Sequence, residues 1–402
     1  MPDAFVKLRE EAEGLLPGAV ELRRRIHSEP ELGLVLPETQ RAVLDAIGDL
    51  GLEVETGGRT SAVVATLRGD RPGPTLLLRA DMDALPLVEE TGLPFASRRQ
   101  GSMHACGHDA HVAMLAGAAR LLSRRRGDLT GTLKFLFQPG EEGYAGARIL
   151  IEEGLLDAEP RVDGAFAIHV DSSLAPGRIA TRPGPILAAG DVFSIDLAGR
   201  GGHASMPHLA VDPIPVACEI VMALQAMVTR RVDAFDPAVL TVTRIVAGTA
   251  FNVIPAAAQV QGTIRSLSDA TRRLVRERME RVVAGIAGAH EVEAKVHVIP
   301  GYPVTVNDAG FTAFVRGVAS ELAGPEGCID MRAPVMGAED FSYILERVPG
   351  ALVFLGAGPA GGRGEPLHSN RMLLEESALA TGIALHAAVA LRWPEARADA
   401  RA

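Results

Sequence analysis

The chain carries two kinds of apolar pattern. Short, nearly continuous apolar runs at 75–78, 131–138 and 164–168 predict strands that are buried inside a sheet. From Asp191 to Ala198 apolar and polar residues alternate instead, as they do in a strand with one buried face. The pattern therefore predicts one buried α/β sheet and a second, half-buried sheet.

The half-buried sheet belongs to a self-contained unit that we expect at 188–298. Its predicted elements are, in order, a strand at 191–198, a helix capped by Asp212 and begun by Pro213, strands at 239–246 and 257–266, a helix at about 269–287, and a last alternating strand at 292–298. This β-α-β-β-α-β order is the ferredoxin-like arrangement, which is small and complete in itself.

The rest of the chain is expected to form a discontinuous catalytic domain from residues 1–187 and 299–402. A chain of 402 residues exceeds the size at which one hydrophobic core keeps growing, so two domains are expected. Residues of metal-binding type occur on both sides of 188–298. Such a distribution indicates that the smaller unit is inserted into the larger α/β domain.

The stretch from Met103 to His111 places one thiol, three imidazoles and one carboxylate within nine positions. Zinc and similar ions prefer sulfur and imidazole nitrogen ligands. Gly107 permits the short turn that would bring Cys106 and His108 onto one ion. Any one of these histidines is about as often structural as functional, but the cluster as a whole indicates a metal site.

Further polar residues follow the predicted buried strands. They are Asp81 and Asp83 after the first run, Glu141 and Glu142 after the second, and His169 at the end of the third. Because the carboxyl ends of strands converge on one crevice in an open α/β sheet, we expect these residues to line a single site. His368, near the end of the chain, is a further candidate.

The glutamate pair places two carboxylates directly after a predicted strand. On a regular strand Glu141 and Glu142 would face opposite ways, but Gly140 and Gly143 indicate an irregular turn. One glutamate could then bind metal while the other faces a substrate as a general acid or base. The alternative interpretation of the pair is a solvated loop.

Composition narrows the class of partners. A net charge of -10 disfavours nucleic acid, no apolar run reaches about 18 residues, and the first residues lack the apolar core of a signal peptide. The three cysteines, Cys106, Cys218 and Cys328, are too few for a disulfide scaffold and suit a reducing compartment, with Cys218 expected in a helix core. We therefore expect a cytoplasmic protein that acts on a small molecule, with no nucleic-acid or membrane partner.

The motifs resemble, in their order along the chain, the dinuclear metallopeptidases that include aminoacylases and carboxypeptidases. Within that family they are most similar to the amidohydrolase branch of hippurate hydrolase, N-acyl-L-amino acid amidohydrolase and the auxin-conjugate hydrolases. The matching segments are Arg24–Gly33, Arg79–Pro86, Met103–His111, Phe137–Gly143, Gly199–Ser205, Phe251–Pro255, Gly262–Arg265, Met336–Phe341 and His368. The resemblance implies a mixed-sheet, zinc-exopeptidase-like catalytic domain with an inserted lid or dimerisation domain.

The resemblance also implies a set of site residues. By position, two divalent metal ions would be bound by Cys106, His108, Glu142, His169 and His368, with Glu141 as the general base. Cysteine and histidine suit zinc, whereas carboxylates also admit manganese, cobalt or nickel. Much of the family has His-x-Asp where this chain has Asp81-Met82-Asp83, so direct ligation and orientation of the ligands remain open for both carboxylates. We place Asp83 among the catalytic residues.

The implied activity is hydrolysis of the amide bond of N-acyl amino acids to a carboxylic acid and a free amino acid. The alternatives are a dipeptidase, an N-acetyl-diaminopimelate deacetylase, or a metal- or solute-binding protein without catalysis. Glu141 argues against the last of these, because a pure binding site needs no carboxylate base beside its ligands.

The smaller domain supplies three further candidates. His203 lies among small residues, and the resemblance implies that it reaches a catalytic crevice, commonly that of a partner in a homodimer or homotetramer; there we expect it to stabilise the oxyanion. Arg265 and Asn252 are candidate anchors for a substrate carboxylate, since arginine matches that group with two parallel hydrogen bonds. Without those roles, His203 would be a surface loop residue and Arg265 an exposed strand-end charge.

Overall fold

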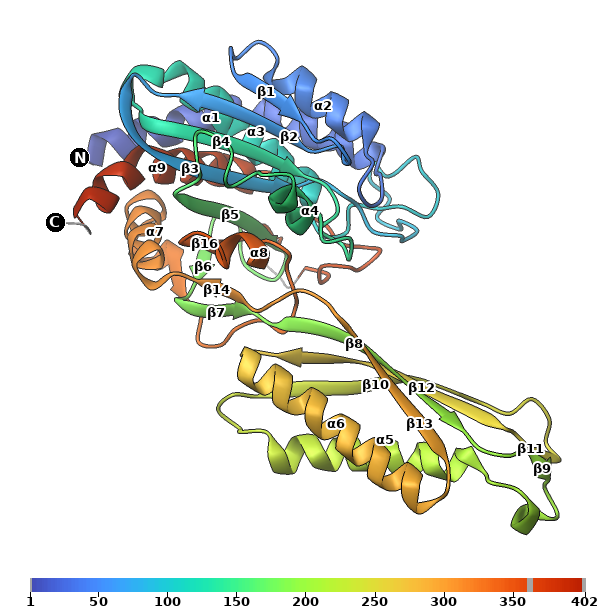
Figure 1. Ribbon diagram of the computed structural model, residues 1–402. Coiled ribbons are helices and arrows are strands. Elements are labelled where there is room, and N and C mark those ends of the chain that lie inside the picture. The colour runs from blue at the N-terminus through green and yellow to red at the C-terminus, as the bar shows by residue number, and fades with distance from the viewer. Residues whose placement is uncertain (1, 360–363, 400–402) are drawn as a thin grey trace. The chain divides into compact units, whose positions relative to one another are not determined.

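The computed structural model describes residues 2–359 and 364–399, and the chain divides into two compact units (Figure 1). Unit 1 comprises Met1–Ile186, Val306–Ala333 and Tyr343–Ala402, and unit 2 comprises Leu187–Thr305 and Pro334–Ser342. Residues 1, 360–363 and 400–402, which the expected catalytic domain includes, lie outside the described residues.

The boundaries of unit 2 differ from the expected 188–298. Residues 299–305 and 334–342 pack with unit 2 instead of with the catalytic domain. The reason is hydrogen bonding beyond the alternating strands: the Gly190 N–H donates to the Tyr302 carbonyl (3.1 Å), and the Ala188 N–H donates to the Gly337 carbonyl (2.8 Å). No periodic pattern in the sequence marks these contacts.

Unit 1 is built on a mixed sheet of eight strands. In spatial order they are β1 (Glu53–Thr56), β2 (Val63–Arg68), β4 (Thr130–Gln138), β3 (Arg71–Asp81), β5 (Gly164–Asp171), β16 (Gly350–Gly356), β6 (Ile179–Thr181) and β15 (Cys328–Asp330). The central strands β4, β3, β5 and β16 are parallel, whereas β1, β2 and β6 introduce antiparallel pairs. The apolar runs that predict buried strands are almost completely buried. The expected mixed-sheet α/β class is confirmed.

Helices cover this sheet. They are α1 (Pro2–Ser28), α2 (Pro37–Ile47), α3 (His108–Arg124), α4 (Gly146–Glu152), α7 (Ala309–Ala323), the short α8 (Ser342–Leu345) and α9 (Ala378–Asp399). α1, α3 and α9 contact one another, and α3 and α9 also contact the central strands. Phe135, Phe137 and Phe166 from the sheet lie in the shared core, which fixes the strand ends that carry the polar residues.

Unit 2 has the expected β-α-β-β-α-β order. Its elements are β8 (Ala189–Ala198), α5 (Pro213–Arg231), β10 (Ala238–Ala247), β12 (Ala257–Ser266), α6 (Asp269–Ala289) and β13 (Glu293–Pro300). The strands form an antiparallel sheet in the order β10-β12-β8-β13. The inward residues of β8 and β12 share a core with α5 and α6, so these two helices cover one face of the sheet.

The predicted cap of α5 is confirmed, since the Asp212 side chain accepts the Ile214 N–H (3.0 Å). α5 is also long and apolar enough to span a membrane by length and composition, but its buried stripe belongs to the core of unit 2. Cys218 was expected in that stripe and is exposed, because it lies two positions from both Val216 and Ile220 and so faces away from them.

Two small pairs of strands complete the fold. β9 (Gly202–His203) pairs with β11 (Val253–Ile254) at one end of unit 2. β7 (Gly184–Leu187) pairs with β14 (Thr305–Asn307) where the chain passes between the units. Three 3-10 turns, η1 (Arg126–Asp128), η2 (Pro207–Leu209) and η3 (Pro325–Gly327), lie between the larger elements.

Candidate metal centre

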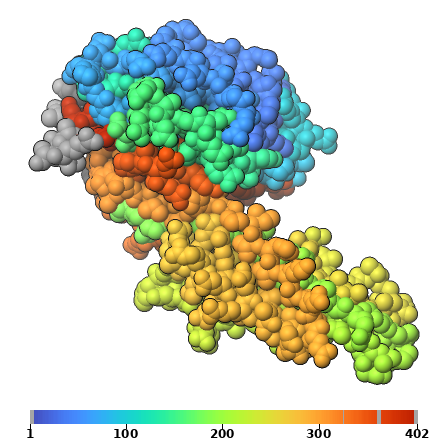
Figure 2. Space-filling model, in the orientation of Figure 1, coloured from blue at the N-terminus to red at the C-terminus, as the bar shows by residue number. Residues whose placement is uncertain are grey.

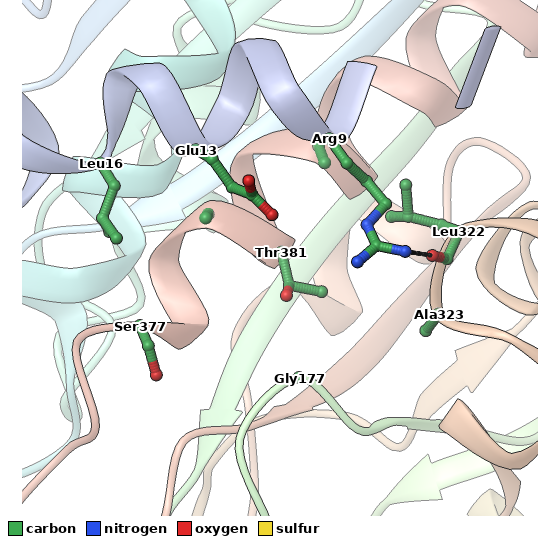
Figure 3. A pocket seen from close by; sticks show the side chains of 10 residues that line it. Arg9, Glu13, Leu16, Gly177, Leu322, Ala323, Ser377 and Thr381 are labelled. Atoms are coloured by element: carbon green, nitrogen blue, oxygen red, sulfur yellow. Dashed lines mark hydrogen bonds between the residues drawn. The ribbon is translucent and has the colours of Figure 1, made fainter. Parts of the chain in front are cut away.

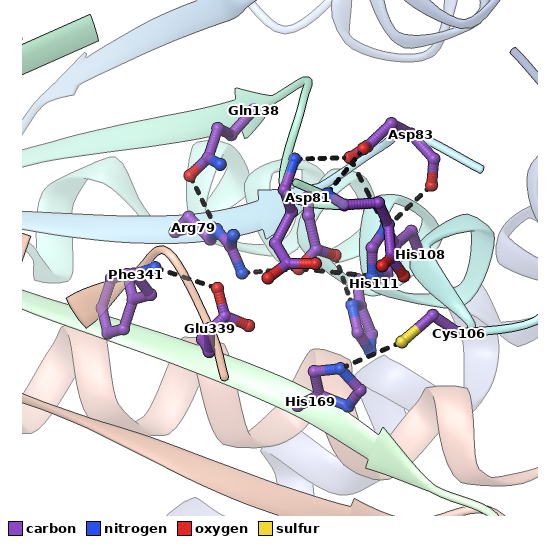
Figure 4. A network of polar contacts seen from close by, with 12 residues as sticks. Arg79, Asp81, Asp83, Cys106, His108, His111, Gln138, His169, Glu339 and Phe341 are labelled. Carbon is purple, nitrogen blue, oxygen red and sulfur yellow. Dashed lines mark hydrogen bonds and ion pairs between the residues drawn. The ribbon is translucent and has the colours of Figure 1, made fainter. Parts of the chain in front are cut away.

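The metal-type residues of unit 1 gather at the carboxyl ends of three neighbouring strands (Figure 4). Asp81 is the last residue of β3, His169 lies near the end of β5, and the glutamate pair follows β4 directly. Cys106 and His108 come from the turn that begins α3, where Gly107 has the positive φ of 82° that the sequence suggested. The fold therefore joins residues from four chain segments in one crevice.

All five residues expected to bind metal fall into two groups. Cys106, His108 and His169 form one group, and Cys106, Glu142 and His368 form the other, with the ligand atoms of each group within 4.8 Å of one another. Cys106 belongs to both groups. The two groups would suit two cations, with Cys106 available to both.

The two buried histidines are oriented by the backbone. The Nδ1 atom of His108 donates to the carbonyl of Asp83 (2.8 Å), and the Nδ1 atom of His169 donates to the carbonyl of Val170 (2.8 Å). In its neutral form each ring therefore presents an unprotonated Nε2 atom, and the Nε2 atom of His169 lies 3.5 Å from the Cys106 sulfur (Figure 4). The Nε2 atom of His108 is buried and makes no hydrogen bond within the described part of the chain. A divalent cation would satisfy it.

The electrostatics of the crevice fit a cation as well. Burial lowers the pKa of His169 to about 3, so its imidazole is neutral at physiological pH. Burial raises the pKa of the Cys106 thiol, which a neighbouring cation would lower again. Hydrogen bonding to Cys106 and Glu142 raises the pKa of His368 to about 10, so a cation would displace a proton there.

Asp83 holds the turn that carries the glutamate pair. Its Oδ1 atom accepts the Glu141 N–H (2.9 Å) and its Oδ2 atom accepts the Glu142 N–H (2.9 Å). The expected irregular turn is present, because Gly140 and Gly143 have φ values of 76° and 87°. One carboxylate thus fixes two consecutive amides beside the ligand groups.

Asp81 lies in a buried hydrogen-bond network behind the crevice. It accepts hydrogen bonds from Arg79 Nη1 (2.5 Å) and His111 Nδ1 (2.5 Å), and its Oδ2 atom lies 3.7 Å from His108 Nε2. Although burial opposes ionisation, the Arg79 guanidinium holds the pKa of Asp81 well below its usual range. A charged Asp81 beside His108 raises the pKa of that imidazole despite burial. The carboxylates of Asp81 and Asp83 therefore both accept hydrogen bonds from other groups of the protein.

Only two of the five metal-type residues in the 103–111 segment contribute to the two groups that contain Cys106. Both nitrogens of His111 are occupied, since Nδ1 donates to Asp81 and Nε2 accepts the Val170 N–H (2.8 Å). Asp109 points away and accepts hydrogen bonds from Arg23 (3.0 Å) and His27 (2.8 Å) of α1. Some polar residues of this segment therefore hold the structure around the site, while Cys106 and His108 face the site itself.

The sequence analysis assigned no role to the N-terminal Arg23 and His27, or to Glu89. His27 is buried between the carboxylates of Asp109 and Glu89. Burial alone would lower its pKa, but these carboxylates outweigh that effect and raise the pKa to about 9. The Arg24–Gly33 motif was the only signal for this cluster, and it did not indicate which partner lies opposite.

The candidates of unit 2 lie at its two ends. His203 is exposed on β9 next to the loop of Asn252, whose carbonyl accepts the Ala204 N–H (3.1 Å). Arg265 lies near the opposite end of β12, opposite Gly190 and Val239. Eight residue steps from Ala257 to Arg265 span about 27 Å at roughly 3.4 Å per residue. The two expected anchors, Asn252 and Arg265, therefore cannot bind one small carboxylate within a single copy of unit 2.

A pocket of about 380 Å³ lies elsewhere in unit 1, against α1, α7 and α9 (Figure 3). Arg9, Glu13, Ser377 and Thr381 are its polar lining residues, and Arg9 donates to the Leu322 carbonyl (3.5 Å). None of its lining residues belongs to the two ligand groups.

Comparison with known proteins gives consistent matches. Residues 77–392 match the model of peptidase family M20/M25/M40. The chain is 39% identical to "Thermostable carboxypeptidase 2" of Saccharolobus solfataricus (97% of this chain, 99% of the relative) and 38% identical to "N-acetylcysteine deacetylase" of Bacillus subtilis (90% and 92%). Among solved structures, a Bacillus subtilis protein described as a dinuclear metal binding peptidase from M20 family has a TM-score of 0.83 at 34% identity, covering 95% of this chain and 99% of that one.

Proposed function

The chain belongs to peptidase family M20/M25/M40 and is a metal-dependent hydrolase of amide bonds, and on that premise we propose that it cleaves N-acyl amino acids to a carboxylic acid and a free amino acid. One observation carries this proposal: two groups of ligand atoms share Cys106, and a buried glutamate, Glu141, follows the same strand end. The N-acetylcysteine deacetylase relative supports an N-acyl amino acid as substrate.

Two divalent metal ions are the implied cofactors, and the residues fit them. Cys106, His108 and His169 would hold one ion, and Cys106, Glu142 and His368 would hold the other. When bound, the ions supply a water nucleophile whose pKa is lowered toward about 7 and a positive charge that polarises the scissile carbonyl. Sulfur and imidazole nitrogen favour zinc, and Glu142 also admits manganese, cobalt or nickel.

Glu141 would act as the general base and then as the general acid. It is 6% exposed and lies with His108 and Glu142 in a group whose ligand-type atoms are within 4.8 Å of one another. In the proposed role its carboxylate takes the proton of the attacking water and gives it to the departing nitrogen, which then leaves as an amine. Asp83 would support this role indirectly, because its carboxylate accepts hydrogen bonds from the backbone N–H groups of Glu141 and Glu142.

His203 would stabilise the oxyanion of the tetrahedral intermediate. It belongs to unit 2, whose residues contribute to neither of the two groups that share Cys106. Delivery of its imidazole then requires either closure of unit 2 or contact with a second copy of the chain. We propose the second route, in a homodimer or homotetramer formed through unit 2.

The separation of the two anchors favours a shared site. Asn252 neighbours His203, whereas Arg265 lies at the other end of β12. One small substrate can contact both an Arg265 and an Asn252 only if they come from different copies of unit 2. We therefore propose that Arg265 binds the substrate carboxylate and that His203 and Asn252 come from the partner.

A peptidase is the second candidate, because the thermostable carboxypeptidase relative is similar over 97% of this chain. A dipeptide has the same scissile amide and a free carboxylate, but it adds a charged amine.

Three free cysteines, one of them a proposed ligand, favour a reducing compartment, and we propose the cytoplasm.

A panel assay tests the proposed function. The purified chain, loaded in turn with zinc, manganese, cobalt and nickel, is given N-acetyl and N-benzoyl amino acids, dipeptides and N-acetyl-diaminopimelate. We expect the highest kcat/KM on an N-acyl amino acid. A higher kcat/KM on dipeptides would favour the peptidase, and absence of turnover with every substrate and metal would contradict both.

A further inference from the structure

The imidazole of His203 is held by an adjacent residue at one ring nitrogen. The N–H of Ser205 lies 3.1 Å from the Nδ1 atom of His203, and the Ser205 hydroxyl oxygen lies 2.8 Å from the same atom. An amide N–H can only donate, so Nδ1 must accept and carries no proton. The hydroxyl, at hydrogen-bond distance from an accepting nitrogen, donates as well.

This contact determines where the neutral ring carries its proton. A neutral imidazole has one N–H and one lone pair, and the lone pair is committed to Ser205. The proton therefore lies on Nε2, at the other side of an exposed ring. Nε2 is the nitrogen that is free to donate to a group outside the loop.

The loop presents this ring on a defined backbone. His203 pairs with Val253 in the β9-β11 ribbon, and its carbonyl accepts the Met206 N–H (2.9 Å), which closes the turn that contains Ser205. A Cβ at Gly202 would lie 2.9 Å from the Ala210 side chain, so the close approach of these strands requires a small residue. The space-filling view shows this part of unit 2 at the surface, where the segments near residues 205 and 250 meet (Figure 2).

We propose that Ser205 is a positioning residue that fixes the tautomer of His203 with the proton on Nε2, so that the ring meets the oxyanion with an N–H donor. The proposal rests on the role that we assign to His203. The opposite tautomer would direct a lone pair at a developing negative charge and would repel it. Ser205 thus makes His203 a donor before substrate arrives.

The tautomer itself is measured by nitrogen-15 NMR of the full-length, zinc-loaded protein at mildly alkaline pH. The His203 signals are identified as those that are missing from the spectrum of His203→Gln. We expect its Nδ1 to resonate as an unprotonated nitrogen and its Nε2 as a protonated one. His208, exposed in η2 and without a hydrogen bond to its ring among the described residues, is the internal reference for an unrestrained imidazole. A protonated Nδ1 in the neutral His203 ring would overturn the proposal.

Three variants connect the tautomer to turnover. Ser205→Ala removes the hydroxyl but keeps the backbone N–H, so it should weaken the tautomer preference without abolishing it and lower kcat roughly 2- to 10-fold, the effect of one net hydrogen bond, with KM and metal content unchanged. Ser205→Thr restores the hydroxyl and should recover most of kcat. Met206→Ala changes a side chain of the same turn but leaves both Ser205 hydrogen bonds to the ring in place, and should leave kcat unchanged.

The outcomes separate this proposal from a structural role and from the proposed function. If Ser205→Ala lowers the melting temperature but leaves both kcat and the ring nitrogen shifts unchanged, Ser205 only stabilises the loop and the proposal fails. If the shifts respond to Ser205 while His203→Ala retains full kcat, Ser205 sets the tautomer as proposed, but His203 has no part in catalysis.

Discussion

The sulfur of Cys106 lies 3.5 Å from the Nε2 atom of His169. Each has a second neighbour of ligand type in the crevice, but only Cys106 belongs to both groups that make up the proposed dinuclear centre. The two residues should therefore differ in how many cations depend on them. Elemental analysis measures that difference directly.

The first prediction concerns metal content. Cys106→Ala should lose most of both bound ions, whereas His169→Ala should retain close to one ion per chain, because it disturbs a single group. Both variants should lose activity. Retention of two ions by Cys106→Ala would contradict the shared-ligand arrangement.

The second prediction separates the two glutamates. Glu141→Gln should keep its metal and lose most turnover, since an amide cannot accept the water proton. Glu142→Gln should instead weaken metal binding, because its carboxylate is grouped with Cys106 and His368. If metal is lost in Glu141→Gln and kept in Glu142→Gln, the two assignments are reversed.

The third prediction concerns the two hydrogen bonds by which Asp83 holds the turn of Glu141 and Glu142. An asparagine at position 83 has one acceptor oxygen, so Asp83→Asn should lose one of the two amide hydrogen bonds. We expect kcat to fall about 10-fold, with most of the metal retained. Asp70→Asn, a change at an exposed carboxylate, is the matched control. Unchanged kcat in Asp83→Asn would show that the turn keeps its geometry without both hydrogen bonds to Asp83.

The fourth prediction is a pH dependence of stability. Because the folded-state pKa of His27 is raised to about 9 from an ordinary 6.5, its contribution is complete below pH 6.5 and is lost as the pH rises through 9. The free energy of unfolding should fall between pH 7 and pH 10 by on the order of 2 kcal/mol more in the wild type than in His27→Gln. Urea unfolding at both pH values, with equal metal loading, measures the difference. Equal losses in the two proteins would show that His27 is not charged in the folded state.

The fifth prediction tests the shared site. Glu141→Gln and His203→Ala subunits, each inactive alone, are mixed under conditions in which subunits exchange. In a two-fold dimer half of the molecules are mixed and each has one intact composite site, so up to about a quarter of wild-type activity should return. No recovery after demonstrated exchange would mean that His203 acts within its own chain.

Much of the fold could be predicted because its signals are local. The buried runs gave the central strands, and the alternation around Phe193 and Ile195 gave the sheet of unit 2. The convergence of Glu141, Glu142 and His169 also followed from a general property of parallel strands, namely that their carboxyl ends share one edge.

The rest depended on contacts between residues far apart in the sequence. Nothing near His111 reveals that the Val170 N–H occupies its Nε2 atom, and nothing near Asp83 reveals that it accepts the Glu141 N–H from another strand end. The distance between Asn252 and Arg265 likewise follows from the register of β12 and not from composition. Sequence identified the residue types, and the tertiary contacts decided which of them face the crevice.

Because Cys106 belongs to both proposed ligand groups, the metal preferences of the two proposed positions should be linked. A polarisable sulfur neighbour biases each position toward borderline or soft cations and away from hard ones such as magnesium. A substitution of Cys106 that changes the metal preference of one proposed position would therefore change that of the other. Independent adjustment of one position would then depend on the proposed ligands that are not shared, which are His108 and His169 for one group and Glu142 and His368 for the other.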